Sequence, residues 1–400
     1  MIIENVKVFL NGKVEEKNLV IENGEIKEII NGSKRGEEKI DGKNLLVLPG
    51  LIDPHVHLRE PGATHKEDFY TGTRAAVAGG FTTVLDMPNN PKPTITLERL
   101  KEKIDLASKK AICDVGFHFG ATSDNFKEIR KAKPNSLKII MGQTTGNLLI
   151  TDEKTIEKHF INFDKEKPIV IHAEDQEYCE KNKHDGPEAA WLAVEKVSLL
   201  AEKIDRRIHI AHTSTVKEIE IAKKWKKCTV ESAPHYLFLS KKDYDKLGFR
   251  KSVKPCLREE KYRAKFWKNI DKLDCIGSDH APHTLEEKEG GAYGFPELET
   301  SFHLFIDQYS KGNVSLKWIT EKMSSSPAKI FNIHKKGEIK KGYFADLIFV
   351  DLKKEWVLKE EELETKCKWS PYNGWKFKGK VFGVMNKGKM KYWEYEFLVD

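Results

Sequence analysis

The sequence predicts an α/β protein, namely a (β/α)8 TIM barrel with a small β-sandwich built from both chain ends. The middle of the chain alternates short apolar strands with amphipathic helical segments, which is typical of a parallel barrel. The first and last segments instead show strand-like alternation with tight turns. The chain has 400 residues, of which 39% are hydrophobic, and this suits one large barrel with an accessory module.

Strand-like alternation dominates both ends of the chain. It runs through residues 1–30 and recurs near the other end, as in residues 381–393. Two β-rich ends around a different middle predict one composite β-sandwich domain, formed by residues 1–45 and 338–400. The Asn-Gly pairs, which favour two-residue hairpin turns, lie at 11–12, 23–24 and 31–32.

The middle of the chain, residues 46–337, is assigned to the barrel. Its helical stretches include residues 97–110 and 186–204, in which apolar residues recur with a period near 3.6. Eight repeated strand–helix units predict a closed parallel barrel. The eight strand candidates are residues 46–58, 81–88, 114–121, 137–141, 168–174, 207–213, 228–236 and 274–283.

The charge of the chain raises the question of a nucleic-acid partner. The net charge is +7 and the pI is about 8.8, with the densest basic run at residues 223–227. That run ends a helical pattern, so we interpret it as a solvated helix end and not as a phosphate-binding patch. We therefore expect no nucleic-acid partner, and a nucleic-acid module is only a distant alternative.

The sequence indicates a cytoplasmic location. No apolar run approaches the ~18 residues of a membrane helix. Residues 1–20 lack the basic and apolar segments of a secretion signal. The six cysteines are scattered and form no CxxC pair, which is typical of free thiols in a reduced cytosol. We expect no membrane partner.

Reactive polar side chains stand where the predicted strands end. In TIM barrels the active site lies at the carboxyl ends of the strands, so residues from six different strands should converge on one mouth. They are His55, His57, Asn89, Lys138, His172, His212 and Asp279.

Five of these residues have the chemistry of zinc ligands. His55 and His57 are two positions apart on a strand, so both imidazoles face the same side and can reach one metal ion. His172, His212 and Asp279 close three further strands, and imidazole with carboxylate is the set that catalytic zinc favours. His209 lies mid-strand and is interpreted as packing or bonding to backbone. We also interpret as structural the histidines His118, His184, His303 and His334.

Lys138 near the end of an apolar strand is costly to bury as a cation. Such a lysine is ordinarily paired with an acid or extends its amine to solvent. Next to two metal ions the neutral amine is favoured instead, and this amine can react with carbon dioxide. The product is an anionic carbamate with two oxygens that can bridge two metals.

The motifs around these residues resemble dihydroorotases of the amidohydrolase superfamily. The resemblance covers essentially the whole barrel, and GYFADLIFVDL near the end is similar to the superfamily's composite β-sandwich. HVHLREPG and DHAPH separate dihydroorotases from most cyclic-amide hydrolases on this fold. The segments that carry the resemblance are residues 49–69, 87–89, 168–174, 233–237 and 278–288.

The resemblance implies a centre with two zinc ions per subunit. His55, His57 and Asp279 would hold the first zinc, and His172 and His212 the second. Carboxylated Lys138 would bridge them. Asp152 is the alternative bridge, but it is interpreted as a helix N-cap or first-turn residue. Ala211 replaces a cysteine that some relatives use for a further metal, so two zincs are expected and not three.

The resemblance also implies a substrate-binding set of Arg59, Asn89 and His283. A guanidinium binds a carboxylate through two hydrogen bonds, which suits a substrate with a carboxylate. The alternative for Arg59 is a salt bridge with Glu60 or Glu67. Gly294 would offer backbone contacts to the substrate ring, and Lys254 further positive charge. Whether loops 142–147 and 284–297 close over substrate stays open.

The implied reaction is the reversible cyclisation of N-carbamoyl-L-aspartate to (S)-dihydroorotate plus water, in de novo pyrimidine (UMP) biosynthesis. Two zinc ions would lower the pKa of a bound water, and the hydroxide would attack the ring amide carbonyl. Asp279 would take the hydroxide proton and pass it to the departing nitrogen, as general acid/base.

Two other functions are kept as alternatives. The first is another cyclic-amide hydrolase, such as a dihydropyrimidinase, hydantoinase or allantoinase, which would not need Arg59 for a carboxylate. The second is a non-catalytic dihydroorotase-like partner of a transcarbamoylase, although such relatives typically lose metal ligands. We expect a small-molecule substrate, with a homo-oligomer or an association with a transcarbamoylase as possible assemblies.

Overall fold

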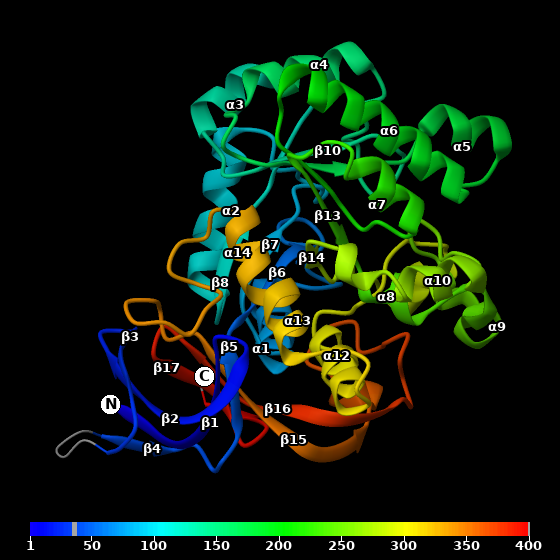
Figure 1. Cartoon of the computed structure of the whole chain (residues 1–400). Helices are drawn as coiled ribbons and strands as arrows, with labels where there is room; N and C mark the ends of the chain where they lie inside the picture. Colours follow the sequence, from blue (N-terminus) through cyan, green and yellow to red (C-terminus); the bar gives the residue numbers. More distant parts are fainter. Residues whose placement is uncertain (34–37, 399–400) are drawn as a thin grey trace.

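The computed structural model describes residues 1–33 and 38–398. Figure 1 shows two parts, a barrel with surrounding helices above and a β-domain below that holds both chain ends. The predicted fold class, a (β/α)8 barrel with a β-domain from both ends, is confirmed. In the described part of the chain, no helix is both long and apolar enough to cross a membrane.

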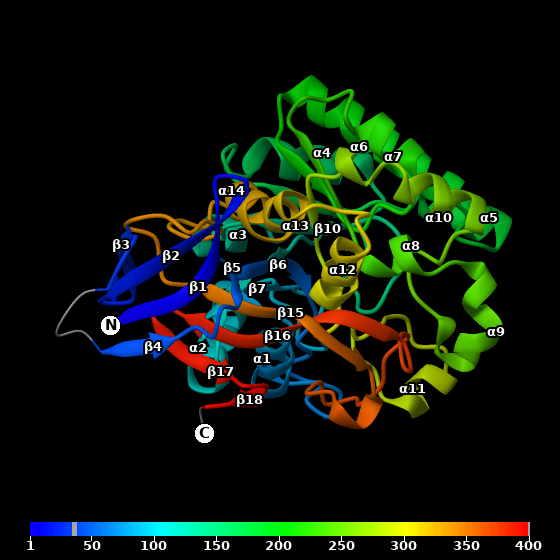
Figure 2. The same cartoon turned by 60° about the horizontal axis from the view of Figure 1, so that its bottom comes forward.

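The lower domain is one nine-stranded sheet in the order β18-β17-β16-β15-β5-β1-β2-β3, with β4 beside β1. The two ends of the chain join where β5 pairs with β15 in antiparallel register, and Figure 2 shows these strands side by side. Because residues 46–49 pair in this sheet, the end sheet extends past residue 45; the domain boundaries themselves stay a prediction. The strands are β1 (Ile2–Leu10), β2 (Lys13–Glu22), β3 (Glu25–Ile30), β4 (Lys39–Asp41), β5 (Leu46–Pro49), β15 (Leu347–Val357), β16 (Lys376–Asn386), β17 (Lys389–Trp393) and β18 (Glu396–Phe397).

Two of the Asn-Gly pairs form the predicted hairpin turns. Asn11 and Gly12 have φ of 49° and 84°, and they connect β1 to β2 between the paired residues Leu10 and Lys13. The second pair, at 23–24, has φ of 53° and 80° and connects β2 to β3. Positive φ at both central residues is the type I′ geometry, which matches the twist of the strands it joins.

The barrel strands run parallel, and each lies within one of the eight segments that the sequence predicts as strands. Hydrogen bonds group them as β6-β7-β8 and β9 to β14, and a parallel bridge between Val56 and His280 joins the first strand to the last. The third strand is interrupted at His118, whose ring contacts the Pro54 carbonyl oxygen at 2.9 Å and Ser136 Oγ at 2.7 Å. The strands are β6 (Leu51–Val56), β7 (Phe81–Asp86), β8 (Asp114–Phe117), β9 (Phe119–Gly120), β10 (Leu137–Ile140), β11 (Ile169–His172), β12 (Ile208–Ile210), β13 (Cys228–Ser232) and β14 (Cys275–Ile276).

Helices follow the strands around the barrel, and side chains cap several of them. Asp152 accepts a hydrogen bond from the Thr155 backbone N–H at 2.9 Å, so it is the N-cap that the sequence predicted. The helices are α1 (Phe69–Ala78), α2 (Leu97–Lys110), α3 (Phe126–Ala132), α4 (Glu153–Asn162), α5 (Gln176–Asn182), α6 (Pro187–Ile204), α7 (Val216–Ala222), α8 (Pro234–Phe238), α9 (Tyr244–Leu247), α10 (Glu260–Trp267), α11 (Leu285–Glu289), α12 (Ser301–Ser310), α13 (Leu316–Thr320) and α14 (Ser326–Ile330). Short turns of other helix types lie at Lys241–Asp243, Gly248–Lys251, Ile270–Lys272, Glu321–Ser325 and Glu360–Glu362.

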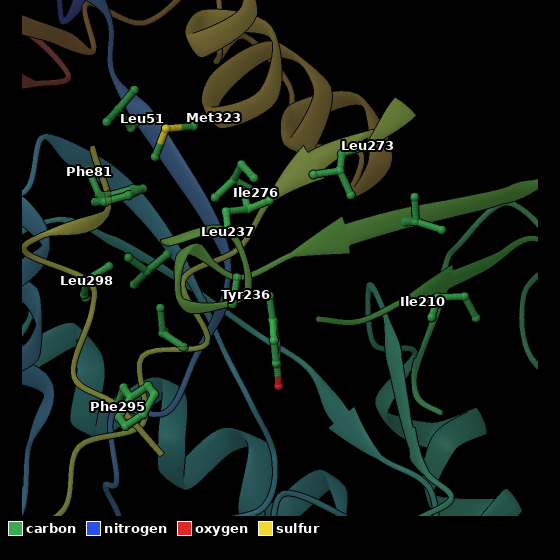
Figure 3. Packing of buried hydrophobic residues seen from close by; sticks show 14 of the residues in the cluster. Leu51, Phe81, Ile210, Tyr236, Leu237, Leu273, Ile276, Phe295, Leu298 and Met323 are labelled. Carbon is green, nitrogen blue, oxygen red and sulfur yellow. The ribbon is translucent and has the colours of Figure 1, made fainter. Parts of the chain in front are cut away.

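A large hydrophobic core packs the barrel strands against the surrounding helices. Leu51, Phe81 and Met323 belong to this core and are buried, and Figure 3 shows them close together. Figure 3 also shows Tyr236 and Phe295, which belong to the same core and are buried near the carboxyl ends of the strands. Burial of apolar surface contributes ~25 cal/mol per Å², so this core gives the strand ends a rigid base.

Candidate active site

The carboxyl ends of the barrel strands meet at a narrow pocket. All six predicted metal-binding residues line it, together with three of the four predicted substrate residues. The lining includes His55, His57, Arg59, Asn89, Lys138, His172, His212, Asp279 and Gly294.

The first predicted ligand group is assembled by the two ends of the barrel. His55 and His57 come from β6, and Asp279 follows β14. Asp279 Oδ1 lies 3.3 Å from His55 Nε2 and 3.1 Å from His57 Nε2. One ligand atom from each residue lies within 4.8 Å of the other two, which is close enough for one metal ion.

The second predicted group lies beside the first. His172 Nδ1 and His212 Nε2 are 2.9 Å apart. The ring centroids of His55 and His212 are 5.4 Å apart, so the two groups are neighbours. Imidazoles from the first, fifth and sixth strands therefore meet at one place, as the proposed chemistry requires.

Lys138 lies on β10, the fourth strand of the barrel, and its side chain lines this pocket. Its side chain is 4% exposed, and no acceptor among the described residues forms a hydrogen bond with Nζ. Burial lowers the pKa of Lys138 to about 8, although Glu231 and Asp279 oppose the shift. A buried amine without a partner fits a residue that gains its partners only when the centre is assembled.

Electrostatics keep the pocket ready for a cation. Burial opposes the charge of Asp279, but the adjacent His55 and His57 outweigh it and hold the pKa of that carboxyl well below its usual range. Burial lowers the pKa of His57 to about 3. Burial, and next the charge of His172, hold the pKa of His212 well below its usual value. These histidines are therefore neutral near pH 7, which is the form that binds a metal.

Three site residues have left-handed backbone conformations. Their φ angles are 62° for Arg59, 38° for His212 and 49° for Asp279. A residue other than glycine is uncommon in this region, and each instance costs on the order of 1 kcal/mol or more. Each one lies just after a barrel strand, where the backbone turns and aims the side chain into the pocket. The tertiary structure therefore tolerates strain where it positions these three groups.

The Arg59 guanidinium brings positive charge to one side of the pocket. Burial, and next the charges of Arg59 and Lys66, lower the pKa of His283 to about 2, so this imidazole is neutral and accepts from Arg59. The side chain of Arg59 is buried, and it donates to the Pro282 carbonyl at 3.0 Å and to His283 Nε2 at 3.1 Å. The structure gives no salt bridge between Arg59 and Glu60 or Glu67, which was the alternative interpretation. His283 does not line the pocket itself but contacts it through Arg59.

The loop at residues 142–147 lies over the pocket. Thr144 and Thr145 line it, and Asn89 Nδ2 donates to the Thr145 carbonyl at 3.0 Å. Lys254 also lines the pocket and donates from Nζ to the Gln143 carbonyl at 3.0 Å. Hydrogen bonds from Asn89 and Lys254 thus hold the backbone of this loop at two positions.

Gly294 stands where a side chain would not fit. Its φ is 140°, and a Cβ there would lie 2.4 Å from the Ala281 carbonyl oxygen. Lys288, which the sequence analysis did not single out, holds the neighbouring backbone: its buried amine donates to the carbonyls of Ser252, Ala292 and Gly294. A single buried lysine, whose pKa burial lowers to about 7, thus organises this side of the pocket.

Several residues that shape the site escaped the sequence analysis. The buried Asp53 carboxylate accepts from the backbone N–H of His55 and of Ser278, at 3.0 Å each, and so ties the first strand to the last. Glu231 contacts His55, and Glu174 contacts His172. Asp53 lies in the motif that carries His55, but no local pattern indicates that it bonds to a residue 225 positions away.

A deeper group of His209, Glu231 and Cys275 also has ligand atoms within 4.8 Å of one another. His209 was expected to pack or to bond to backbone. The packing is present, since its ring lies edge-on to Phe331 with the ring centroids 5.3 Å apart. Its ring nitrogens contact side chains and not backbone, namely Thr229 Oγ1 at 2.8 Å and Glu231 Oε2 at 3.1 Å. The other residues interpreted as structural, with Asp152, do not line the pocket.

The sheet domain also holds loops that surround the pocket. The fully buried Trp369 follows the turn Glu360–Glu362 and donates from Nε1 to the His283 carbonyl at 2.7 Å. Thr365 and the Lys366 backbone N–H donate to buried Glu67 in the loop after β6. A segment near the end of the chain therefore fixes two loops of the barrel mouth.

Trp369→Phe is expected to raise KM for the carboxylate substrate roughly tenfold, because an unpaired buried carbonyl costs ~1–3 kcal/mol and releases His283. Steady-state kinetics measure this. Trp393→Phe, on β17 of the same domain but packed on Phe349 and Phe382, is the control and should lower only the melting temperature. An unchanged KM in Trp369→Phe would contradict the role.

Fold and site together define a hydrolase with a metal-type centre at the mouth of a barrel, and comparison with known proteins agrees. The amidohydrolase family model matches residues 46–391, and the chain belongs to this family. Within it, the chain is grouped with the dihydroorotases. The dihydroorotase of Pyrococcus abyssi is 40% identical over 390 residues, which cover 96% of this chain and 93% of that protein.

The chain is also similar to one segment of a multifunctional protein and to a solved structure with the same fold. The multifunctional protein CAD of Squalus acanthias is 35% identical over 373 residues, which cover 90% of this chain but 16% of that protein. The L-hydantoinase (dihydropyrimidinase) of Arthrobacter aurescens superposes with a TM-score of 0.93 at 24% identity, covering 100% of this chain and 97% of that structure. At that identity the likeness shows the fold alone.

Proposed function

We propose that this chain is a dihydroorotase that interconverts N-carbamoyl-L-aspartate and (S)-dihydroorotate plus water in pyrimidine biosynthesis, with two zinc ions bridged by carboxylated Lys138. The class of enzyme, a hydrolase of cyclic amides, follows from the family. The observation that carries the particular substrate is the buried Arg59–His283 pair beside the histidine groups. A hydantoin or dihydrouracil ring has no carboxylate to pair with the buried Arg59 guanidinium.

The residues present fit a zinc pair. His55, His57 and Asp279 would hold one ion, and His172 and His212 the other. Lys138 Nζ would lose a proton on attacking carbon dioxide, and the carbamate oxygens would bridge the two ions. The buried, unpartnered amine, which lines the same pocket as both groups, supports this assignment.

When bound, the zinc pair would lower the pKa of water and polarise the amide carbonyl of the substrate. Asp279 would accept the proton of the attacking water and return it to the departing ring nitrogen. Arg59 would hold the substrate carboxylate with charge-assisted hydrogen bonds, and His283 would fix the guanidinium. The loop at 142–147 would limit the access of bulk water to the reacting ring.

The test of the function is a steady-state comparison of dihydroorotate, dihydrouracil, hydantoin and allantoin as substrates of the zinc-loaded enzyme. Dihydroorotate should have the highest kcat/KM by at least about 100-fold, because only it presents a carboxylate to buried Arg59. A higher kcat/KM for hydantoin or allantoin would support the alternative hydrolase. No turnover of any substrate would support a non-catalytic partner.

Arg59→Met is expected to raise KM for dihydroorotate roughly 100-fold or more, since a buried charge pair lost on one side costs ~2–5 kcal/mol. Zinc content should not change, because Arg59 is not in the ligand groups. Arg74→Met is the control. Arg74 lies on α1 and forms an ion pair with Glu364, and its loss should leave KM at the wild-type value. A wild-type KM in Arg59→Met would remove the basis for the substrate assignment.

We further propose a cytoplasmic location, with a small-molecule substrate and without a nucleic-acid or membrane partner. All six cysteines are free, which suits a reducing cytoplasm. We also propose a homo-oligomer or an association with a transcarbamoylase; the second agrees with a relative that carries the matching segment as a small part of a multifunctional chain.

A further inference from the structure

We infer that two buried glutamates, Glu231 and Glu174, are positioning residues that each fix the ring orientation of one zinc-binding histidine, His55 and His172. Glu231 would serve the first ion and Glu174 the second. The inference rests on the proposed zinc pair.

Glu231 lies at the end of β13, directly below the first ligand group. Its Oε1 is 2.5 Å from His55 Nδ1, and its Oε2 is 3.1 Å from His209 Nε2. Its side chain is 1% exposed. Both carboxylate oxygens therefore have partners, and Glu231 with His209 forms a hydrogen-bonded support for His55.

Glu174 has the same relation to the second group. It stands two residues after His172, and its Oε2 is 3.1 Å from His172 Nε2. Its side chain is 2% exposed. On the opposite ring nitrogen, His172 Nδ1 faces His212 Nε2 at 2.9 Å.

These contacts define which nitrogen of each ring is free. An ionised carboxylate can only accept, so His55 Nδ1 and His172 Nε2 must carry the protons. In a neutral imidazole the other nitrogen then has the lone pair. The lone pairs of His55 Nε2 and His172 Nδ1 are therefore left for a metal, and both atoms lie on the ligand side of their groups.

The backbone leaves space for both glutamates. A Cβ on Gly277 would lie 2.9 Å from Glu231 Oε2 and 3.0 Å from His55 Cβ. A Cβ on Gly142 would lie 2.6 Å from Glu174 Cβ. Each carboxylate is thus seated beside a glycine of a neighbouring strand end, where any larger residue would push it away from its histidine.

Support of this kind matters because a metal-binding imidazole is held by a partner on its other nitrogen. Loss of such a partner typically weakens metal binding by about 10–100-fold. The two glutamates contact different histidines, so each should affect mainly the ion that its own histidine binds.

The experiment measures zinc affinity and not turnover. Metal-free wild type, Glu231→Ala and Glu174→Ala are titrated with zinc against a chromophoric chelator. Each variant is expected to weaken one of the two binding steps by roughly 10–100-fold. Glu231→Gln keeps an acceptor oxygen for His55 and should recover most of the affinity lost in Glu231→Ala.

Glu218→Gln is the matched control. Glu218 is also buried, but it accepts from Ser214 and Thr215 and contacts no histidine. It should keep both zinc constants. The melting temperatures of the metal-free proteins distinguish a loss of stability from a loss of zinc affinity. A lower melting temperature with unchanged zinc affinity in the alanine variants would mean a purely structural role and would overturn the inference.

A second measurement does not depend on variants that fold. Nitrogen-15 NMR of labelled histidines in the metal-free wild type should show the proton of His55 on Nδ1 and that of His172 on Nε2. The reverse tautomer at either ring would overturn the inference.

The zinc titration also separates this inference from the proposed function. If wild type binds fewer than two zinc ions, the proposed centre fails. If wild type binds two and the alanine variants bind them equally well, only the role of the glutamates fails. A stoichiometry of three that falls to two in Glu231→Ala would make Glu231 a ligand and not a positioning residue.

Discussion

Asp279→Asn is expected to lower kcat for dihydroorotate by roughly 10³-fold or more while the barrel stays folded. Asp279 Oδ1 is close to both His55 Nε2 and His57 Nε2, so it stands where a proton must be taken from water and returned to nitrogen. An amide of the same shape cannot take that proton. Steady-state kinetics measure kcat, metal analysis measures the zinc content, and a melting curve shows whether the barrel stays folded.

Asp274→Asn is the matched control for Asp279→Asn. Asp274 directly precedes β14 and accepts from the Val230 backbone N–H at 2.7 Å, outside the pocket. The amide keeps an acceptor oxygen there, so kcat should stay within about twofold. A near wild-type kcat in Asp279→Asn with full zinc content would refute its role as acid and base.

Lys138→Met is expected to lose zinc and at least about 100-fold of activity. Methionine has a similar length and suits a buried position, so the strand β10 should stay packed. It cannot form a carbamate, and the two histidine groups would then lack the anion shared between them. Zinc analysis and kinetics of freshly purified protein measure both effects.

The chemical state of Lys138 can be read directly. Wild type equilibrated with carbon-13 bicarbonate should show a carbamate signal by NMR, and Lys138→Met should not. Lys322→Met, at another buried lysine outside the pocket, is the control and should keep zinc and activity. Full zinc content in Lys138→Met would show that no bridge is needed from this residue.

The fold was predictable because its signals are local. Strand candidates such as 137–141 and 168–174 are short apolar runs between helical patterns, and both contain barrel strands. The interruption at His118 and the inclusion of residues 46–49 in the end sheet were not predictable. Both depend on which strands meet when the barrel and the sheet close, and no sequence period records that.

The candidate site was predictable for a similar reason. Ligand chemistry at the ends of apolar strands points to one mouth of a parallel barrel, and His55, Lys138 and Asp279 are there. Their supports were not predictable. Glu231 lies 176 positions from His55, and Trp369 lies 86 positions from His283, so only the folded chain shows these partners.

The kinds of groups that meet at the mouth could be read from the sequence, because residue type and strand-end position are local properties. The tertiary structure decided which ring nitrogens are free, which carboxylates support them, and how Arg59 is held between Pro282 and His283. The physical reason is that a buried hydrogen bond needs its partner within about 3 Å. That distance is set by the packing of segments far apart along the chain.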